Sequence, residues 1–291
     1  MKIIFDRSAF HKESFNLLKD SQFLQLTGAG KIQVFHTTVF LDETIRMAKA
    51  KKKGAKDELK RQWAFLMQIC NGGWFKPLLV GKPPKLNSVC YDEFEGKNAG
   101  SNWPLVSDKM RKGTEQKVSK FLQGTGSLTE LDNSKAVHDQ NEQVKAVLRS
   151  AFVELRNKNI LPKNTTLEDY IKVNVYDFGE HLMRLFPDLD QREAKLDAWR
   201  ADINRFPHFS AYVESHVYAW YDAERNQNSK LDRNWIGDAE YLCFLIDVDA
   251  IVTSDAKFMR RAFEALWQPR GKRIFTPEEF VDFLHRSAAP L

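Results

Sequence analysis

Both ends of the chain alternate short apolar runs with apolar positions at helical spacing. Residues 3–5 form an apolar run that predicts a buried strand, and a helical pattern follows it as far as the glycines at 28–30. A second apolar run at 32–35 precedes a pattern that predicts a helix capped by Thr37 or Thr38. This order of strand, helix, strand and helix is typical of a parallel sheet covered by helices.

The same order returns near the carboxyl end. The pattern predicts a short buried helix, a strand, a helix and another strand, at residues 239–245, 249–253, 257–267 and 273–275. A last helix should begin at Thr276–Glu279, with the threonine as N-cap, a proline at the first position and acids at the positive end of the helix dipole. We therefore expect both ends to build one α/β domain.

The middle of the chain, from about 50 to 205, is expected to be mostly helical. Helical patterns occur here and just beyond it, at 140–156, 167–186, 190–204 and 210–224. Residues 72–104 are interrupted by Gly-Gly, Pro-Pro, Asn and Ser, which predicts an extended loop. No internal repeat is visible.

Composition narrows the class of protein. The chain has 291 residues, of which 43% are hydrophobic, and a formal net charge of +5, so it can build a core and is not globally disordered. It contains neither an apolar run long enough to span a membrane nor a secretory signal pattern. Three cysteines without a CxxC pair favour a reducing compartment. We expect a cytoplasmic protein without membrane association.

The candidate chemistry depends on acids at strand ends. Asp6 follows the first predicted strand and Asp255 follows the strand at 249–253, so parallel strands would bring them to one edge of the sheet. Glu43 lies in the helix after the second strand, and Asp238 opens the helix that leads to Asp255. Four converging carboxylates repel one another unless a cation neutralises them. Oxygen ligands without His or Cys favour Mg²⁺ or Mn²⁺.

These acids, in this order, resemble the acidic motifs of PIN-domain nucleases. The most specific part is the step of 17 residues from Asp238 to Asp255 across a short helix and a strand. Phe258 and the closing pattern at 274–280 also suit the family. The resemblance covers about 1–48 and 205–286 and implies a three-layer α/β fold with a central parallel sheet, an acidic metal pocket and hydrolysis of phosphodiester bonds, usually in RNA.

The chain departs from compact members of that family in one large respect. Between Glu43 and Asp238 lie 194 residues, so we expect a PIN-like domain made of 1–50 and 205–291 that is interrupted by a mostly helical insertion at 51–204. Arg7, beside Asp6, also replaces the small polar residue that the resemblance leads us to expect.

The resemblance implies a role for each candidate acid. Asp6 and Asp255 would bind the metal, Asp238 would complete its ligands or hold a metal-bound water, and Glu43 would be a ligand or orient the nucleophile. Asp232 competes with Asp238 for the third position. Weaker supporting roles fall to three hydroxyl side chains, Ser8, Thr253 and Ser254. Each acid also has a simpler interpretation, since Asp238 resembles a helix N-cap and Glu43 a solvated helical acid. Three other acids are read as solvated or turn residues, namely Asp42, Asp247 and Asp249.

Cations near these acids are candidates for contact with a phosphate backbone. They are Lys51, Lys52, Lys53 and Lys56, which continue the helix of Glu43, and Arg260 and Arg261, which follow Asp255. The leading hypothesis is a ribonuclease that uses Mg²⁺ or Mn²⁺. A structure-specific DNA nuclease and a catalytically silent nucleic-acid-binding or scaffold protein remain alternatives. The resemblance also allows a homodimer, an inhibitory protein partner and a role as a toxin or defence effector.

Overall fold

The computed structural model describes residues 1–49, 55–79, 88–98, 100, 103–127, 142–147, 164–184, 186, 189–225, 235–255 and 257–288. In this part of the chain, five strands form one sheet in the order β3-β2-β1-β4-β5, and every pair is parallel. The strands are β1 (Lys2–Phe5), β2 (Gln33–His36), β3 (Gly73–Trp74), β4 (Ala250–Val252) and β5 (Arg273–Phe275). The prediction of an α/β fold with a central parallel sheet is confirmed.

The two ends of the chain meet at the centre of this sheet. Strand β1 lies between β2 and β4, with Ile3 opposite both Val34 and Ala250. Residues 3–5 and 250–252 are completely buried, as expected for parallel strands that are covered on both faces. The register continues past the strands, because the amide of Asp6 donates to the carbonyl of Val252 at 3.0 Å.

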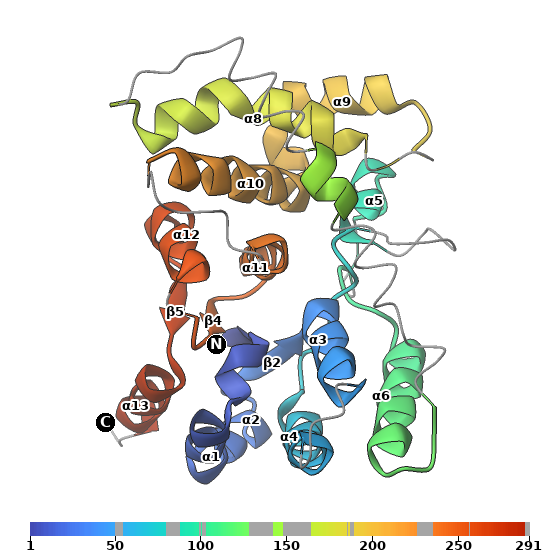
Figure 1. Ribbon diagram of the computed structural model, residues 1–291, viewed down its shortest axis with the longest axis vertical. Helices are drawn as coiled ribbons and strands as arrows, with labels where there is room; N and C mark the ends of the chain where they lie inside the picture. The colour runs from blue at the N-terminus through green and yellow to red at the C-terminus, as the bar shows by residue number, and fades with distance from the viewer. Residues whose placement is uncertain are drawn as a thin grey trace.

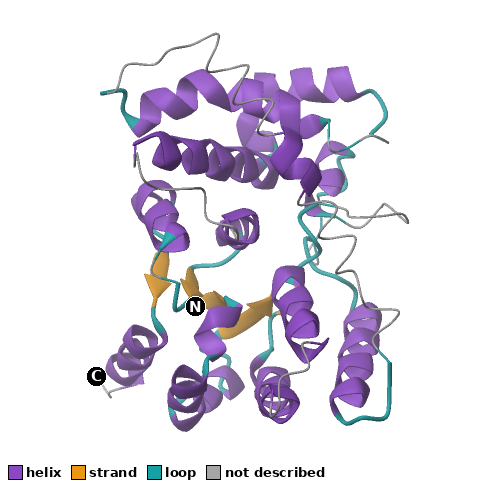
Figure 2. Cartoon of the chain, in the orientation of Figure 1, coloured by secondary structure: helices purple, strands orange, loops and turns teal. Residues whose placement is uncertain are grey.

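Helices cover both faces of the sheet (Figure 1). One layer contains α1 (Lys12–Asp20), α2 (Phe23–Gly28), α4 (Ala55–Ile69) and α13 (Pro277–Ala288). The other contains α3 (Thr38–Lys49), α11 (Trp235–Cys243) and α12 (Phe258–Leu266). Short 3-10 turns occur at Arg7–Phe10, Ile203–Arg205, Phe244–Ile246 and Gln268–Arg270. Figure 2 shows the strands enclosed by these two helical layers.

A further group of helices packs beyond α11 and α12. Helix α10 (Pro207–Arg225) contacts both of them and also α8 (Leu167–Met183), which packs against α9 (Arg192–Ala201). Gly179 permits the close approach of α9, because a Cβ there would lie 2.1 Å from the ring of Trp199. Helix α5 (Val89–Phe94) contacts α10, and α6 (Asp108–Leu122) packs on α4.

Most predicted elements are confirmed within a few residues. The helix after β2 has Thr37 at its start, since the Thr37 hydroxyl accepts the amide of Phe40 at 3.2 Å. At α13, the amide of Glu279 donates to the Thr276 hydroxyl at 3.1 Å, and the amide of Thr276 donates back to the Glu279 carboxylate at 2.7 Å. This reciprocal pair is a capping box. Of the helix expected at 140–156, only 142–147 is described, and it is helical.

Two local predictions are wrong. Residues 72–104 contain β3 and α5 rather than an extended loop, so the sheet takes its edge strand from within the stretch expected as an insertion. Helix α5 begins where Ser88 accepts the amide of Tyr91 at 3.2 Å. Asp238 is not an N-cap, because α11 begins at Trp235 and Asp238 lies inside its first turn. No helix of the described residues is both long and apolar enough to cross a bilayer.

Candidate functional site

Asp6 occupies the carboxyl end of the central strand, beside the end of β4. Its side chain is 6% exposed, and burial raises its pKa above the ordinary value, opposed by hydrogen bonds from Ser8 and Thr253. The negative charge of Asp255 raises that pKa further. A buried carboxyl at this edge, within the field of a second acid, is the starting point of the candidate site.

Hydroxyl groups fix the position of the Asp6 carboxylate. Its Oδ2 accepts the hydroxyl of Ser8 and, at 2.8 Å, the hydroxyl of Thr253. The two hydroxyl oxygens lie 3.2 Å apart, and the amide of Ser254 donates to the Ser8 hydroxyl at 2.9 Å. All three predicted hydroxyl residues therefore lie around Asp6. Ser254 takes part through its backbone.

Asp255 lies in the turn between β4 and α12. Its amide donates to the Thr253 hydroxyl at 2.9 Å, and its Oδ1 accepts the amide of Lys257 at 2.6 Å. Thr253 therefore contacts both acids, because it donates to Asp6 and accepts from Asp255. This chain of contacts orders the segment that carries the second acid.

Glu43 approaches from α3. Its side chain is 28% exposed, and its carboxylate accepts the hydroxyl of Tyr241 at 3.3 Å and lies 3.7 Å from the guanidinium of Arg46. Burial raises the pKa of Glu43 to about 7, and the charge of Asp6 acts in the same direction. Glu43 and Asp6 are therefore close enough to repel each other, and the interpretation of Glu43 as a freely solvated acid is wrong.

Arg7 supplies a buried positive charge behind these acids. It is 7% exposed, its guanidinium donates to the side chain of Gln62, and it lies against the rings of Phe10 and Phe40. Burial lowers the pKa of Arg7, whereas the charges of Tyr241, Glu43 and Asp6 raise it. The residue that departs from the PIN-like pattern thus offsets part of the local negative charge.

Asp238 lies in the first turn of α11 and is 9% exposed. The start of α11 is close to α3, because a Cβ on Gly237 would lie 3.8 Å from the Val39 side chain. Asp238 therefore lies in the same helical layer as Glu43. Its competitor for the third position, Asp232, lies outside the described residues.

The described residues supply fewer metal ligands than the expected site of four acids. Within the described ranges, no group of three or more His, Cys, Asp and Glu side chains is placed to hold a metal ion. Mg²⁺ is, however, usually held by one or two carboxylates with water and substrate oxygens completing its shell. The charges of Asp255 and Asp6 raise the pKa values of Asp6 and Glu43, respectively, so these three acids are the candidates for such carboxylate ligands. Convergence of all four acids on one ion stays a prediction.

A second pair of acids lies between α3 and α11. Asp42 and Glu240 are both half-buried, and burial raises the pKa of Asp42 to about 7 and that of Glu240 to about 8. The charge of Asp42 adds to the shift of Glu240. The interpretation of Asp42 as a solvated acid is therefore wrong. Since the pair depends on how two distant helices pack, no sequence spacing signals it.

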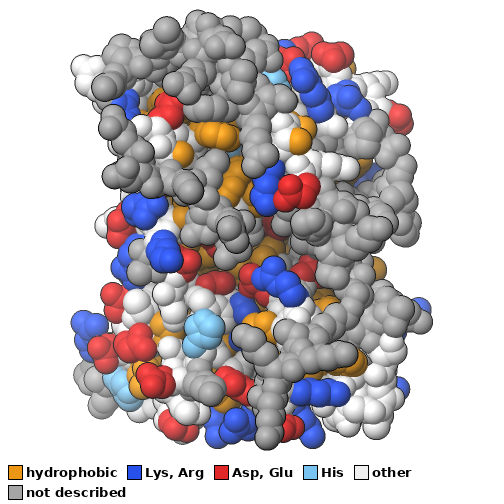
Figure 3. Space-filling view, viewed as in Figure 1, with side chains coloured by type: hydrophobic (Ala, Val, Ile, Leu, Met, Phe, Trp, Pro, Cys, Tyr) orange, Lys and Arg blue, Asp and Glu red, His pale blue; other side chains and the backbone are white. Residues whose placement is uncertain are grey.

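The predicted cations have different surroundings. Lys51, Lys52 and Lys53 lie outside the described residues, and the ammonium of Lys56 lies 4.8 Å from the centre of the Phe121 ring. Arg260 pairs with Glu279 at 3.3 Å, and Arg261 binds both oxygens of Asp222 at 3.2 and 2.8 Å. Arg261 thus ties α12 to α10. Basic and acidic side chains are mixed over the face in Figure 3.

Comparison with protein-family models, curated proteins and solved structures finds no match for this chain.

Proposed function

We propose that this protein is a PIN-like nuclease that uses Mg²⁺ or Mn²⁺ to hydrolyse phosphodiester bonds, with RNA as the favoured substrate. The observation that carries the proposal is the position of Asp6. Its buried carboxylate lies at the carboxyl edge of the central parallel strands and within the field of both Glu43 and Asp255. In open α/β sheets this edge is where ligands bind.

Four carboxylates would have roles at this site. Asp6 would bind the metal together with Asp255 or Glu43, and Asp238 would complete its ligands or hold a bound water. A bound cation lowers the pKa of water and polarises a phosphate, which is the chemistry that hydrolysis requires. Ser8 and Thr253 hold the Asp6 carboxylate in place. Tyr241 orients Glu43 through its hydroxyl.

A cleavage assay tests the proposal. Labelled single-stranded RNA and DNA would be incubated with the protein and Mn²⁺ or Mg²⁺, with and without EDTA. Asp6→Asn keeps the size of the side chain and removes its charge, so we expect metal-dependent cleavage to fall by about 100-fold or more. Asp20→Asn, at an exposed position in α1, is the matched control and should cleave normally. Cleavage in EDTA, or full activity of Asp6→Asn, would refute the site.

The substrate is tested in the same assay. Comparing RNA, single-stranded DNA and branched DNA at one salt concentration separates a ribonuclease from a structure-specific DNA nuclease. One observation favours a silent binding protein, namely that no described group of three acids is placed to hold a metal. Tight nucleic-acid binding without metal-dependent turnover would support that alternative.

A further inference from the structure

Helix α6 carries an unusual surplus of positive charge. Its 15 residues include five Lys or Arg and two acids. The helix packs on α4, where the Trp63 indole donates to the Ser119 hydroxyl at 3.0 Å and the Lys56 ammonium lies 4.8 Å from the centre of the Phe121 ring. Val118 and Leu122 of α6 are buried. The apolar side of α6, which carries these two residues, thus packs against the rest of the protein and is not exposed.

A single arginine contacts both acids of the helix. Arg111 contacts Asp108 at 3.3 Å and Glu115 at 3.0 Å. Its charge also acts on His36, a buried residue at the end of β2, so Arg111 lies on the inner side of the helix. The remaining positive charges are four lysines that are all exposed, namely Lys109, Lys112, Lys117 and Lys120.

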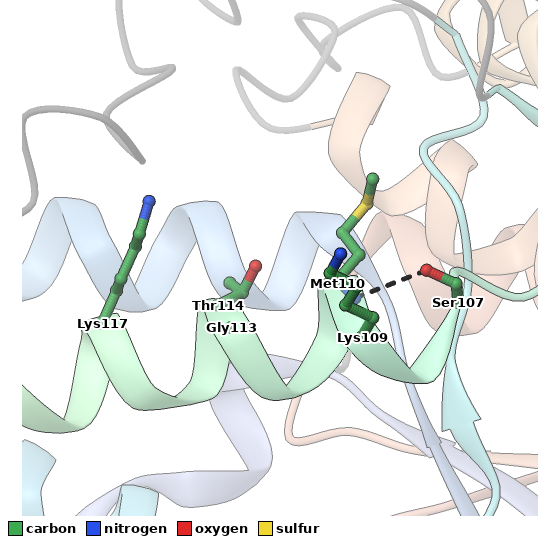
Figure 4. Close-up of a pocket in the computed structure, with 6 residues that line it drawn as sticks. All are labelled: Ser107, Lys109, Met110, Gly113, Thr114 and Lys117. Carbon is green, nitrogen blue, oxygen red and sulfur yellow. Dashed lines mark hydrogen bonds between the residues drawn. The ribbon is translucent and has the colours of Figure 1, made fainter.

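These four residues, called here the lysine face, share one side of α6. At about 100° per residue they fall within a sector of about 140°, and they extend over about 16 Å of helix. Two of them, Lys109 and Lys117, also line an open hollow of about 410 Å³, together with Ser107, Met110, Gly113 and Thr114. Figure 4 shows Met110, Thr114 and Lys117 pointing from the helix to this side.

The lysine face begins at the edge of the sheet that carries the candidate acids. The segment before α6 is joined to the end of β3, since the amide of Val106 donates to the carbonyl of Trp74 at 2.9 Å. Strand β3 is parallel to β2 and, through it, to β1, so its carboxyl end lies at the same edge as Asp6. A chain that leaves the candidate site at this edge can therefore continue along α6.

We propose that the lysine face binds the phosphodiester backbone of single-stranded nucleic acid, a choice of partner that rests on the proposed function. Clustered ammonium groups attract a regular row of phosphates, and the hydroxyls of Ser107 and Thr114 add donors of the kind that contact phosphate oxygens. Gly113 leaves open space around the helix backbone, because a Cβ there would meet nothing within 4 Å. A strand can therefore lie close to the helix.

The test measures binding without cleavage. Fluorescence anisotropy of a labelled single-stranded RNA, in EDTA, gives the Kd between about 50 and 200 mM salt. The variant changes all four lysines of the face to Gln. The control changes four exposed lysines elsewhere to Gln, at Lys19, Lys31, Lys97 and Lys172, so that both proteins lose the same charge.

We expect the lysine-face variant to bind about tenfold or more weakly, and its slope of log K against log salt to be shallower by about 3, since each single-strand phosphate contact contributes about 0.7. The control should resemble the unchanged protein. If the four-fold variant does not fold, by circular dichroism, Lys109→Gln with Lys120→Gln should still reduce the slope by about half as much.

Three outcomes would overturn the inference: no RNA binding by the unchanged protein, equal loss in variant and control, or self-association that the variant abolishes in the absence of RNA binding. Failure of the proposed function gives a different result. In that case RNA would bind through the lysine face in EDTA, yet no cleavage would follow when Mg²⁺ or Mn²⁺ is added.

Discussion

His208 should make the stability of this protein fall as the pH rises above neutrality. The side chain is 0% exposed at the start of α10 and lies between two carboxylates. Its Nδ1 is 2.8 Å from Glu93 and its Nε2 is 2.7 Å from Asp247. Glu93 also accepts the backbone amides of His208 and Phe209, at 2.9 and 3.0 Å. The three side chains therefore join α5, α10 and the turn before β4.

The magnitude follows from the pKa of His208. Burial lowers this pKa, but the hydrogen bonds and charges of Asp247 and Glu93 outweigh burial and raise it to about 9. The unfolded value is about 6.5, so the shift corresponds to about 3 kcal/mol. Because the folded state holds the proton more tightly, this stabilisation is complete below about pH 6.5. It is lost as the pH rises through about 9.

The assay is urea unfolding at several pH values, comparing the unchanged protein with His208→Gln. The glutamine has no charge, so the buried carboxylate of Glu93 and the half-buried carboxylate of Asp247 lose their partner, and we expect a cost of about 3–5 kcal/mol at pH 6.5. Near pH 9.5 the difference between the two proteins should shrink by about 3 kcal/mol. Other groups that titrate in this range, namely Asp42, Glu43 and Glu240, are present in both proteins and cancel in the difference.

A constant difference across this pH range would refute the reasoning, because it would mean that His208 is neutral in the folded protein. Asp247→Asn gives a second test of the raised pKa of His208. It removes one charge and keeps a hydrogen-bonding group, so the pKa of His208 should fall and the loss of stability should begin at a lower pH.

Three further predictions concern local packing and helix ends. Gly179→Ala should lower the free energy of unfolding by about 2 kcal/mol or more, since its Cβ would lie 2.1 Å from Trp199; an unchanged Tm would contradict this close contact. Gly113→Ala in α6 meets open space, so urea unfolding should show a gain of about 0.5–1 kcal/mol. Thr276→Ala removes the cap that pairs with Glu279 and should cost about 1 kcal/mol by thermal unfolding, whereas a loss below about 0.3 kcal/mol would show that the cap is dispensable.

The sheet could be predicted where local sequence carries the signal. Residues 3–5 and 250–252 are continuous apolar runs, and the cap at Thr276 needs only residues that are three apart. Strand β3 carries no such signal. It has two residues, and its place depends on pairing with β2 and on a hydrogen bond from Val106. In the sequence, a loop rich in Gly and Pro cannot be distinguished from a short edge strand.

The surroundings of the acidic side chains could likewise be predicted only in part. Placing Asp6 and Asp255 at one edge required only the positions of two strands. By contrast, His208 meets Glu93 across 115 positions of the sequence and Asp247 across 39. Asp247 was expected to be a solvated or turn acid. It does lie in a turn, but its carboxylate contacts a buried histidine, which that expectation did not include. Contacts of this kind depend on the packing of α5 and α10, which hydrophobic periodicity does not specify.

Buried carboxyl groups at the junction of β1, α3 and α11 lower the stability of this fold. A carboxyl whose pKa rises from 4.5 to about 7, as in Glu43, costs about 3 kcal/mol above neutral pH. Asp6, Asp42 and Glu240 are shifted in the same direction, and Arg7 offsets this only in part because it is itself buried. Neutral side chains of the same size would remove the cost. Residues that lower stability without a compensating structural role are often retained because they serve a function. Asp42 and Glu240 therefore belong beside Asp6 and Glu43 in any search for the groups that bind a cation.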